Sequence, residues 1–255
     1  MTSPAVDVLM AVRAPAPWLA ETLSSLQYQD FGDHRLIAVM DGFDTGIDAL
    51  LRGWRGTKLV ITQPKSSGLA SCLNAGLREA KAPLVARIDA DDLMRGDRLD
   101  HQVRHMTAHP KCLAVSSSMV EIDEAGTALR IRRKQATSVQ NVLGRLRWRS
   151  ALSHPATMYR TGVVRDLGGY NEEAEGVEDY ELWLRLAAIG ELHRLREPLT
   201  SYRIHQNQVS VVSKPSGRAY AAVRHARLSL AQNRYESVIA AHARHLVWRT
   251  WQAIR

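Results

Sequence analysis

The chain has 255 residues, 45% of them hydrophobic, and a formal net charge of +8. This composition excludes a disordered chain. Because the sequence has no apolar stretch of membrane-spanning length and no secretory leader pattern, it favours a cytoplasmic protein over an integral membrane or secreted one. The positive charge favours polyanionic partners, namely nucleotides, nucleic acid or an anionic membrane surface, without choosing among them.

Strands and helices are predicted to alternate over the first hundred residues. Alternation of this kind is typical of a mostly parallel sheet covered by helices on both faces, so we predict an α/β fold. Apolar and β-branched runs predict strands at 6–12, 36–40, 58–62 and 84–89, and helical spacing of apolar residues predicts helices at 17–28, 45–54, 68–81 and about 97–108.

The pattern changes after residue 108. Two strand-like segments, 113–121 and 127–132, flank a turn and predict an antiparallel hairpin. A basic, helix-prone stretch follows at 138–149, and another helix is expected around 179–189. From Gly217 onward, apolar residues near helical spacing alternate with Arg and His, which predicts one or two helices packed on the domain. We therefore divide the chain into a main domain, 1–216, and a basic helical extension, 217–255.

Three carboxylates follow the apolar strand predicted at 84–89. They are Asp89, Asp91 and Asp92, and they place concentrated negative charge where open α/β folds bind ligands, at the carboxyl edge of the sheet. A helix cap would explain one aspartate, not three. Hard oxygen ligands suit Mg²⁺ or Mn²⁺, which commonly fill their remaining positions with water and substrate phosphates. The sequence therefore predicts a site for a metal-bound diphosphate.

Two further segments precede this cluster in the chain. Asp41 and Gly42 end the second predicted strand, where a glycine lets backbone approach a ligand, although a simple turn explains the pair equally well. The segment 65–76 is polar and flexible before a helix whose free N–H groups could hold a phosphate. It is not the phosphate loop of an NTPase, because the Gly-Lys-Ser/Thr ending is missing.

Acidic and imidazole side chains recur later in the chain. Glu178 and Asp179 open an amphipathic helix, where complementarity to the helix dipole also explains acids. His205 follows a strand-like segment, and a lone histidine is usually structural. Cys72 and Cys112 lie in apolar surroundings without metal-ligand spacing, which favours buried free thiols over a disulfide or a catalytic pair.

Taken together, these segments resemble the family 2 glycosyltransferases, the large inverting group with the A-type nucleotide-sugar-binding fold (GT-A). The resemblance runs from about Val6 to Ser210 and rests on the order of the motifs. In chain order these motifs are the segment from Gly68 to Gly76, the carboxylate cluster at Asp89, His154-Pro155, Gly168-Gly169-Tyr170, the helix start from Glu178 to Arg185, and Tyr202-Arg203-Ile204-His205.

The resemblance implies a role for each candidate residue. Asp91 would bind the divalent metal, Mg²⁺ or Mn²⁺, and His205 would be a further metal or diphosphate contact. Asp179 would be the catalytic base. Asp41 would recognise the nucleobase or ribose and Asp89 the ribose side of the nucleotide. The full donor-binding set would be Asp41, Lys65, Gly68, Asn74, Asp89 and Ala90, and the acceptor side would include His154, Glu178 and Trp183.

The chain also departs from the family pattern. Its first strand ends in Arg13-Ala14 where the family usually has an aromatic residue followed by Asn, and Met40 replaces the first Asp of a common Asp-Asp-Gly motif. Both departures concern recognition of the donor's base. We expect the donor to be a UDP-linked sugar.

The resemblance implies an inverting displacement at the sugar of a nucleotide-sugar donor, with a saccharide or lipid-linked saccharide as acceptor, in bacterial surface polysaccharide synthesis. Peripheral contact with the inner face of the plasma membrane is expected from the basic tail, where Trp248 and Trp251 lie beside Arg244 and Arg249. A solvated basic face on packed helices is the alternative.

Three other functions are compatible with parts of this sequence. A nucleic-acid-binding module fits the net charge but leaves the carboxylate cluster unexplained, so we expect no nucleic acid partner. A nucleotidyltransferase on a related fold would also need a metal and a diphosphate. An inactive sugar-binding relative is disfavoured because both Asp91 and Asp179 are present.

Overall fold

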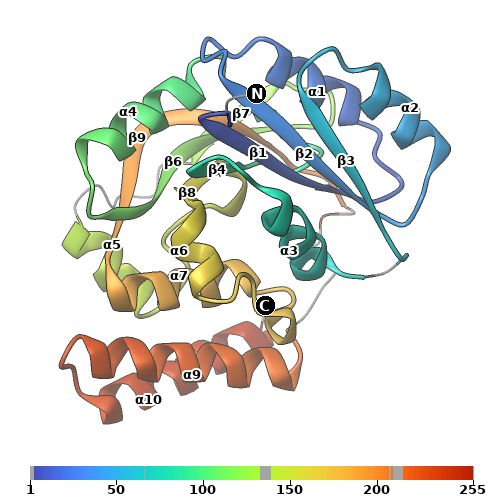
Figure 1. The fold of residues 1–255 in the computed structure, drawn as a ribbon. Coiled ribbons are helices and arrows are strands. Elements are labelled where there is room, and N and C mark those ends of the chain that lie inside the picture. Colours follow the sequence, from blue (N-terminus) through green and yellow to red (C-terminus); the bar gives the residue numbers. More distant parts are fainter. Residues whose placement is uncertain (1–2, 66, 133–138, 207, 209–214, 255) are drawn as a thin grey trace.

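The computed structural model describes residues 3–65, 67–132, 139–206, 208 and 215–254. The strands within these residues are β1 (Val6–Val12), β2 (His34–Asp41), β3 (Lys58–Gln63), β4 (Leu84–Arg87), β5 (Leu93–Met94), β6 (Cys112–Ile122), β7 (Ala128–Arg132), β8 (Thr157–Arg160) and β9 (Glu191–Arg203). They form one nine-stranded sheet in the order β3-β2-β1-β4-β8-β6-β9-β5, with β7 paired to β6 (Figure 1).

Helices cover both faces of this sheet (Figure 1). On one face lie α1 (Leu19–Gln27), α2 (Thr45–Gly53) and α4 (Arg98–Ala108), and on the other lie α3 (Leu69–Glu79), α6 (Thr161–Asp166) and α7 (Glu178–Ile189). The remaining helices are α5 (Val139–Leu146), α9 (Gly217–Asn233), α10 (Val238–Ile254) and short 3-10 turns at His154–Ala156 and Glu172–Ala174. The predicted α/β class, a largely parallel sheet flanked by helices with C-terminal helices added, is confirmed.

The parallel half of the sheet sets the position of the site. β3, β2, β1 and β4 run parallel, and β1 is buried along nearly its whole length, as expected for a strand covered on both faces. Because β2 and β4 are parallel, they end at the same edge. Asp41 is the last residue of β2, and the segment 89–92 follows β4, which ends at Arg87, two residues earlier than predicted.

The other half contains a strand that the sequence only hinted at. β9 pairs in parallel with β6 through several register shifts, and its far end pairs antiparallel with β5, so that Leu93 lies opposite Ser201. β5 directly follows the carboxylate segment. This pairing brings the end of β9, with Arg203 and then His205, beside residues 89–92.

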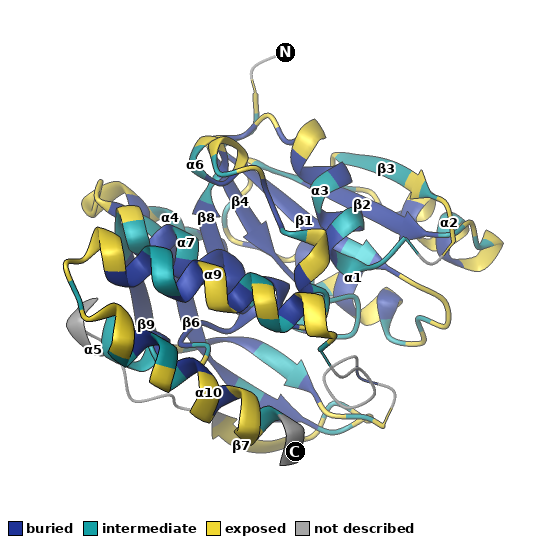
Figure 2. Cartoon of the chain, turned by 90° about the horizontal axis from the view of Figure 1, so that it is seen from below, coloured by how far each residue is buried: buried dark blue, intermediate teal, exposed yellow. Residues whose placement is uncertain are grey.

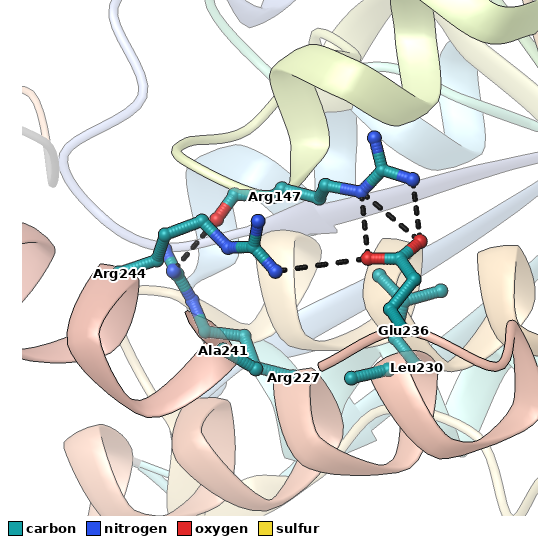
Figure 3. Close-up of a pocket in the computed structure, with 7 residues that line it drawn as sticks. Arg147, Arg227, Leu230, Glu236, Ala241 and Arg244 are labelled. Atoms are coloured by element: carbon teal, nitrogen blue, oxygen red, sulfur yellow. Dashed lines mark hydrogen bonds and ion pairs between the residues drawn. The ribbon is translucent and has the colours of Figure 1, made fainter. Parts of the chain in front are cut away.

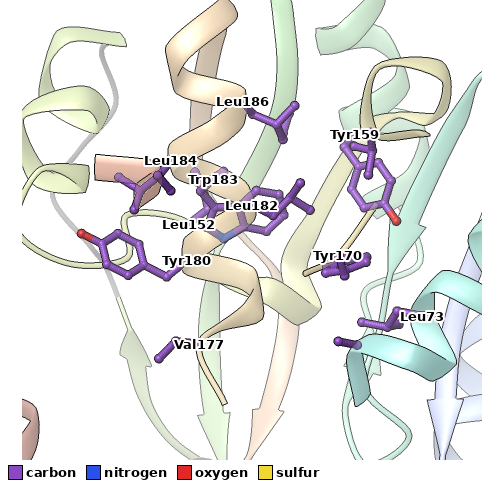
Figure 4. Packing of buried hydrophobic residues seen from close by; sticks show 14 of the residues in the cluster. Leu73, Leu152, Tyr159, Tyr170, Val177, Tyr180, Leu182, Trp183, Leu184 and Leu186 are labelled. Carbon is purple, nitrogen blue, oxygen red and sulfur yellow. The ribbon is translucent and has the colours of Figure 1, made fainter. Parts of the chain in front are cut away.

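Side chains of successive strand residues enter two cores, one on each face of the sheet. In β1, Leu9 packs in the core formed with α3 and α7, whereas Val8 and Met10 pack in the core formed with α1, α2 and α4. Figure 4 shows the first core, which contains Leu182 and Trp183 of α7 together with Tyr159 of β8 and Tyr170. Cys72 and Cys112 are both free and buried, as predicted.

A buried ion pair fixes β1 to its neighbours. The Asp7 carboxylate is fully buried and accepts hydrogen bonds from Arg35 Nε at 2.7 Å and Nη2 at 3.0 Å. The backbone N–H groups of Lys81 and Ala82 donate to the same carboxylate over 2.6 and 2.8 Å. A carboxylate inside the fold is tolerated here because its oxygens are fully hydrogen-bonded.

The C-terminal helices form an added layer against α7. Arg227 of α9 is buried and donates to the carbonyl oxygens of Arg147 at 2.7 Å and Trp148 at 3.0 Å. Arg147 in turn forms an ion pair with Glu236, which Arg244 of α10 approaches at 3.6 Å (Figure 3). Apolar residues of α9 belong to the same core as α7. The division at residue 216 stays a prediction.

Trp248 differs from the expectation that it would face a membrane. Its side chain is only 3% exposed, and its ring lies 5.6 Å from those of Tyr180 and Tyr220, so it packs inside the molecule. Trp251 remains 43% exposed on the outer side of α10. Among the residues that the structure describes, no helix has both the length and the hydrophobicity needed to cross a bilayer.

Candidate active site

Asp89, Asp91 and Asp92 form a tight turn directly after β4. The Asp92 N–H donates to the Asp89 carbonyl oxygen over 3.3 Å, and one carboxylate oxygen from each side chain lies within 4.8 Å of the others. The side chains of Asp89 and Asp91 are 33% and 29% exposed, whereas Asp92 is fully buried. The structure thus brings the three carboxylates together at the carboxyl edge of the sheet, two of them open to solvent.

The carboxylates raise one another's proton affinity. Burial raises the pKa of Asp92 well above its usual range, and the charges of Asp89 and Asp91 raise this pKa further. Burial also raises the pKa of Asp89; the Arg87 guanidinium opposes this shift, and Asp91 and Asp179 add to it. Asp179 therefore lies close enough to act electrostatically on the cluster. A divalent cation would relieve this repulsion.

The donor set suits a hard divalent cation. Three carboxylates in reach of one another match the oxygen ligands of Mg²⁺ or Mn²⁺. Asp92 Oδ2 is buried and has no hydrogen-bond partner among the described residues, and a buried carboxylate oxygen without a donor is costly. The residues present therefore fit the predicted cation.

Arg203 holds the carboxylate turn in place. Its backbone N–H donates to Asp92 Oδ1 at 2.9 Å and its Nε to the Asp91 carbonyl oxygen at 3.0 Å. The guanidinium also donates to Glu21 Oε2 at 2.7 Å and to the Glu124 carbonyl oxygen at 2.8 Å. This fully buried side chain ties three segments together. The sequence motif that contains Arg203 did not indicate this role.

His205 reaches the same turn from beyond β9. Its Nε2 lies 2.8 Å from Asp91 Oδ2, and its ring packs on that of Trp18 at 4.6 Å between centroids. Arg203 stacks over the Trp18 ring at 5.2 Å. The predicted neighbourhood of Asp91 and His205 is present in the structure. Their roles as metal ligands stay a prediction.

Two further contacts fix the backbone around the turn. Arg87, buried at the end of β4, forms an ion pair with Asp89, while its carbonyl oxygen accepts from Arg98 at 2.8 Å. The Ala90 carbonyl oxygen accepts from the Thr22 hydroxyl of α1 at 3.0 Å. The sequence did not indicate a role for Arg87, because the role of an arginine inside a buried strand depends on which carboxylate the fold brings next to it.

Asp41 and the segment after β3 meet at this same edge. The Ser67 N–H donates to Asp41 Oδ1 at 2.7 Å. Gly42 has a positive φ of 89°, and a Cβ there would come within 3.2 Å of the backbone of Lys65, so glycine is needed for the two segments to approach. Lys65 itself is exposed. Their contacts with a donor stay predictions.

The start of α3 differs from the expectation of free N–H groups. The Leu69 and Ala70 N–H groups donate to the two carboxylate oxygens of Glu175 at 2.8 and 3.2 Å. Gly68 precedes them with a φ of 89°. A carboxylate at a helix N-terminus is favoured by the same dipole that would attract a phosphate. A donor phosphate at this helix start would have to displace Glu175.

Asn74 lies against a distant turn rather than at the carboxylate cluster. Its side-chain amide donates to the Tyr170 carbonyl oxygen and accepts from the Tyr170 N–H, both at 2.8 Å. A Cβ on Gly169 would come within 2.5 Å of Asn74 Oδ1, so the preceding glycine is required. The structure therefore gives Asn74 a packing role between α3 and this turn.

The start of α7 carries two acids with different surroundings. Asp179 Oδ2 accepts from the Ser150 hydroxyl at 3.5 Å and is partly exposed. Glu178 is buried, which raises its pKa to about 8, and the neighbouring Asp179 charge raises it as well. Near neutral pH Glu178 is therefore largely protonated.

The remaining acceptor-side candidates lie beneath the surface. Burial lowers the pKa of His154 well below its usual range, and its Nε2 lies 3.1 Å from the Tyr170 hydroxyl. Trp183 is fully buried, with its ring 6.0 Å from that of His154. Because Trp183 exposes no surface, the structure gives it a role in the core and corrects the expectation of direct acceptor contact.

A family model described as glycosyl transferase family 2 matches residues 7–168, well over half of the chain. The chain belongs to this family. The resemblance stated from the motifs is therefore confirmed. The matched range of this family 2 chain contains Asp41, Asp89 and Asp91 and ends before Asp179 and His205.

Two relatives illustrate the similarity. The amylovoran biosynthesis glycosyltransferase AmsE of Erwinia amylovora is 29% identical over 175 residues, which cover 68% of this chain and 65% of the relative. The UDP-Gal:alpha-D-GlcNAc-diphosphoundecaprenol beta-1,3-galactosyltransferase of Escherichia coli is 30% identical over 193 residues, covering 74% of this chain and 70% of that enzyme. The chain thus spans about two thirds of the length of these family members.

Solved structures show the same fold. S. aureus TarS 1-349 in complex with UDP-GlcNAc superposes with a TM-score of 0.74 at 18% identity, over 89% of this chain and 66% of TarS. The mannosyltransferase PcManGT from Pyrobaculum calidifontis, in complex with GDP-Man and Mn2+, gives a TM-score of 0.62 at 18% identity, over 99% of this chain and 72% of the other. The expected A-type glycosyltransferase fold is confirmed.

Proposed function

We propose that this chain transfers a sugar from a nucleoside-diphosphate sugar, UDP-linked, to an acceptor hydroxyl with inversion at the anomeric carbon. The observation that carries the proposal is the carboxylate turn at Asp89, Asp91 and Asp92, within electrostatic reach of Asp179, in a chain of family 2. The fold shared with TarS in its UDP-GlcNAc complex supports a nucleotide-sugar donor.

A divalent cation, Mg²⁺ or Mn²⁺, would be held by Asp91 together with Asp89, Asp92 and His205. When bound, such an ion supplies charge stabilisation for the departing diphosphate. The shared fold with a mannosyltransferase complexed with GDP-Man and Mn2+ supports this assignment. Arg203 and Arg87 act as positioning residues, because both hold the carboxylate turn from beneath.

Asp179 is the base that this arrangement favours. In the proposed step the acceptor oxygen forms a bond to the anomeric carbon, the bond to the diphosphate breaks, and Asp179 takes the acceptor's proton. Its neighbour Glu178 is poorly suited, because burial keeps it protonated near neutral pH. Asp179 is partly exposed and begins a helix, where the dipole favours the ionised carboxylate.

The acceptor that we propose is a lipid-linked saccharide used in bacterial surface polysaccharide synthesis. Its support is the similarity to AmsE and to the diphosphoundecaprenol-directed galactosyltransferase. Exposed apolar residues on the basic helix α10, including Leu246 and Trp251, would suit peripheral contact with an anionic membrane.

A screen of nucleotide sugars, each with and without Mn²⁺, tests the proposal. The native donor should raise the melting temperature only with the metal, and donor hydrolysis should release the nucleoside diphosphate. Asp91→Asn, which keeps the side-chain shape beside His205, should weaken metal-dependent UDP binding by at least about tenfold. Asp100→Asn, which changes a partly exposed acid of α4, is the matched control.

Two outcomes would contradict the proposal. Release of pyrophosphate from a nucleoside triphosphate and a sugar phosphate would instead identify a nucleotidyltransferase. Unchanged Mn²⁺-dependent UDP affinity in Asp91→Asn, measured by calorimetric titration, would remove Asp91 from the metal site.

A further inference from the structure

Three histidines gather on a part of the molecule remote from the carboxylate turn. His105 and His109 are four residues apart on and just after α4, and His193 lies near the start of β9. One ring nitrogen from each lies within 4.8 Å of the other two. His105 Nε2 and His193 Nδ1 are 2.8 Å apart, and the His105 and His109 rings stack at 4.2 Å.

Their place in the fold separates this cluster from the active site. His193 lies at one end of β9, opposite Val115 of β6, while Arg203 ends the strand beside the carboxylate turn. Ten residues of strand at about 3.3 Å each put roughly 30 Å between the two ends. The histidines therefore cannot serve the diphosphate site.

In His193 and His109, one ring nitrogen contacts a protein oxygen, and this contact leaves the other ring nitrogen for a metal. His193 Nε2 lies 3.2 Å from Glu191 Oε2, which leaves Nδ1 facing the cluster. His109 Nδ1 lies 2.9 Å from the His105 carbonyl oxygen, so Nε2 is the ring nitrogen of His109 that remains available to a metal. Histidines that bind metals typically donate their second ring N–H to such a carboxylate or backbone carbonyl.

We propose that His105, His109 and His193 form a binding site for a transition-metal ion, with Zn²⁺ as the best match. Three imidazole nitrogens suit Zn²⁺ and not Mg²⁺ or Ca²⁺, which prefer oxygen. With Zn–N bonds of about 2.0–2.1 Å, a tetrahedral site needs nitrogens roughly 3.3 Å apart. The separations present, from 2.8 Å up to 4.8 Å, bracket that value, so side-chain rotation suffices.

The cluster is also accessible to an ion from solution. His109 is exposed, so the fourth coordination position faces solvent and the ion can enter.

A metal here would clamp α4 to the start of β9. The near end of α4 follows the carboxylate turn closely in the chain, and β9 ends beside that turn at Arg203. The metal would join these two elements at their opposite ends, away from the active site. The site is therefore a stabilising one, with no part in the transfer chemistry.

Zinc titration of a chain without a polyhistidine tag, in excess Mg²⁺ to saturate the carboxylate site, tests the proposal. Calorimetry should show one tight Zn²⁺ equivalent per chain, with a matching rise in melting temperature. His109→Gln should weaken binding at least about tenfold, and Glu191→Gln about 10–100-fold, the usual effect of losing a partner of a ligating histidine. His109 is exposed, so its replacement leaves the fold intact.

His101→Gln, one turn earlier on α4, is the matched control and should keep wild-type zinc affinity. Asp91→Asn should keep it too, because the two sites are independent, so failure of the proposed transferase function would leave this result unaffected. Absence of a tight equivalent in the wild type would mean that His105 and His193 share only a hydrogen bond. Equal affinity in His109→Gln and His101→Gln would place the zinc elsewhere. Either result overturns the proposal.

Discussion

Asp179 and Glu178 are adjacent in the chain, yet their surroundings separate their chemistry. Asp179 is partly exposed and lies beside the Ser150 hydroxyl, whereas Glu178 is almost fully buried and accepts from the Gly176 N–H at 2.7 Å. A carboxylate that must accept a proton has to be ionised beforehand, whereas burial keeps Glu178 largely protonated near neutral pH. The contrast favours Asp179 as the proposed base.

Asp179→Asn should leave donor binding intact and reduce transfer by roughly 10²–10⁴-fold, the usual contribution of a positioned general base. The amide keeps the shape and the contact with Ser150 but accepts no proton. UDP binding by calorimetry and product formation with the identified acceptor measure the two effects. Glu173→Gln, an exposed acid shortly before α7, is the control. Near-wild-type transfer by Asp179→Asn, or a product with retained anomeric configuration by NMR, would exclude Asp179 as the base.

Glu178 makes the stability of the fold depend on pH. Burial raises its pKa to about 8 from the ordinary value of 4.5, so between these two values the folded state binds a proton that the unfolded state has lost. The free energy of unfolding should therefore be highest at the acidic end of this range and should fall as the pH rises towards 8. The contribution of Glu178 to this fall is on the order of a few kcal/mol.

Glu178→Gln should remove this dependence, because the amide stays neutral at every pH. Urea denaturation of the wild type and the variant at pH 4, pH 6 and pH 9 measures it. The variant should match the wild type near pH 4, exceed it in stability at pH 6 and exceed it further at pH 9. A variant that follows the wild-type pH profile would show that Glu178 is ionised in the folded state.

At the scale of the elements, Asn74 joins α3 to the turn at Gly169 and Tyr170. Its two 2.8 Å hydrogen bonds satisfy a backbone N–H and a backbone carbonyl of a residue 96 positions away. The resemblance assigned Asn74 to donor binding, and the two roles predict different behaviour on substitution.

Asn74→Ala should lower the free energy of unfolding by about 1–3 kcal/mol, because both Tyr170 backbone groups lose their partner. The melting temperature and the urea midpoint measure this loss, with exposed Asn233→Ala on α9 as the control. A stable variant with weakened UDP binding would instead favour the donor-binding role.

The parallel half of the sheet could be predicted because its strands are continuous apolar runs separated by helices with regular spacing. β9 could not be placed in the same way. Its sequence includes charged residues and Pro198, and its strand character depends on pairing with β6 through register shifts. Partners that lie about a hundred residues apart, such as Glu175 with the α3 start, leave no local signal either.

The site shows the same division. The gathering of Asp89 and Asp91 at the end of a strand could be predicted, because carboxylates this close in the chain repel one another unless a cation lies between them, whereas His205 was expected there only from the family resemblance. The side chains that hold them could not. Arg203 contacts α1, the β6–β7 turn and the carboxylate turn at once, which only the folded chain shows.

At the scale of the whole molecule, the C-terminal helices are a packed layer with one open face. Ala219, Val223 and Leu230 of α9 belong to the core that contains Trp183, so deleting this segment would uncover the core. On α10, in contrast, Ile239, Leu246 and Trp251 are 83%, 62% and 43% exposed (Figure 2). Membrane contact is therefore tested by changing this outer face and not by truncation.

The double variant Leu246→Gln, Trp251→Gln should reduce co-sedimentation with phosphatidylglycerol vesicles at least about tenfold, since losing about 1.4 kcal/mol of apolar burial already weakens binding tenfold. Its melting temperature and donor hydrolysis should match the wild type, because neither side chain belongs to the core. Tyr28→Gln, which alters a side chain 75% exposed at the end of α1, controls for general loss of surface hydrophobicity. The basic residues of α10 make the wild-type interaction sensitive to salt. If the wild type does not bind these vesicles at low ionic strength, the outer face of α10 has no membrane role, and the proposed lipid-linked acceptor would have to reach the site without it.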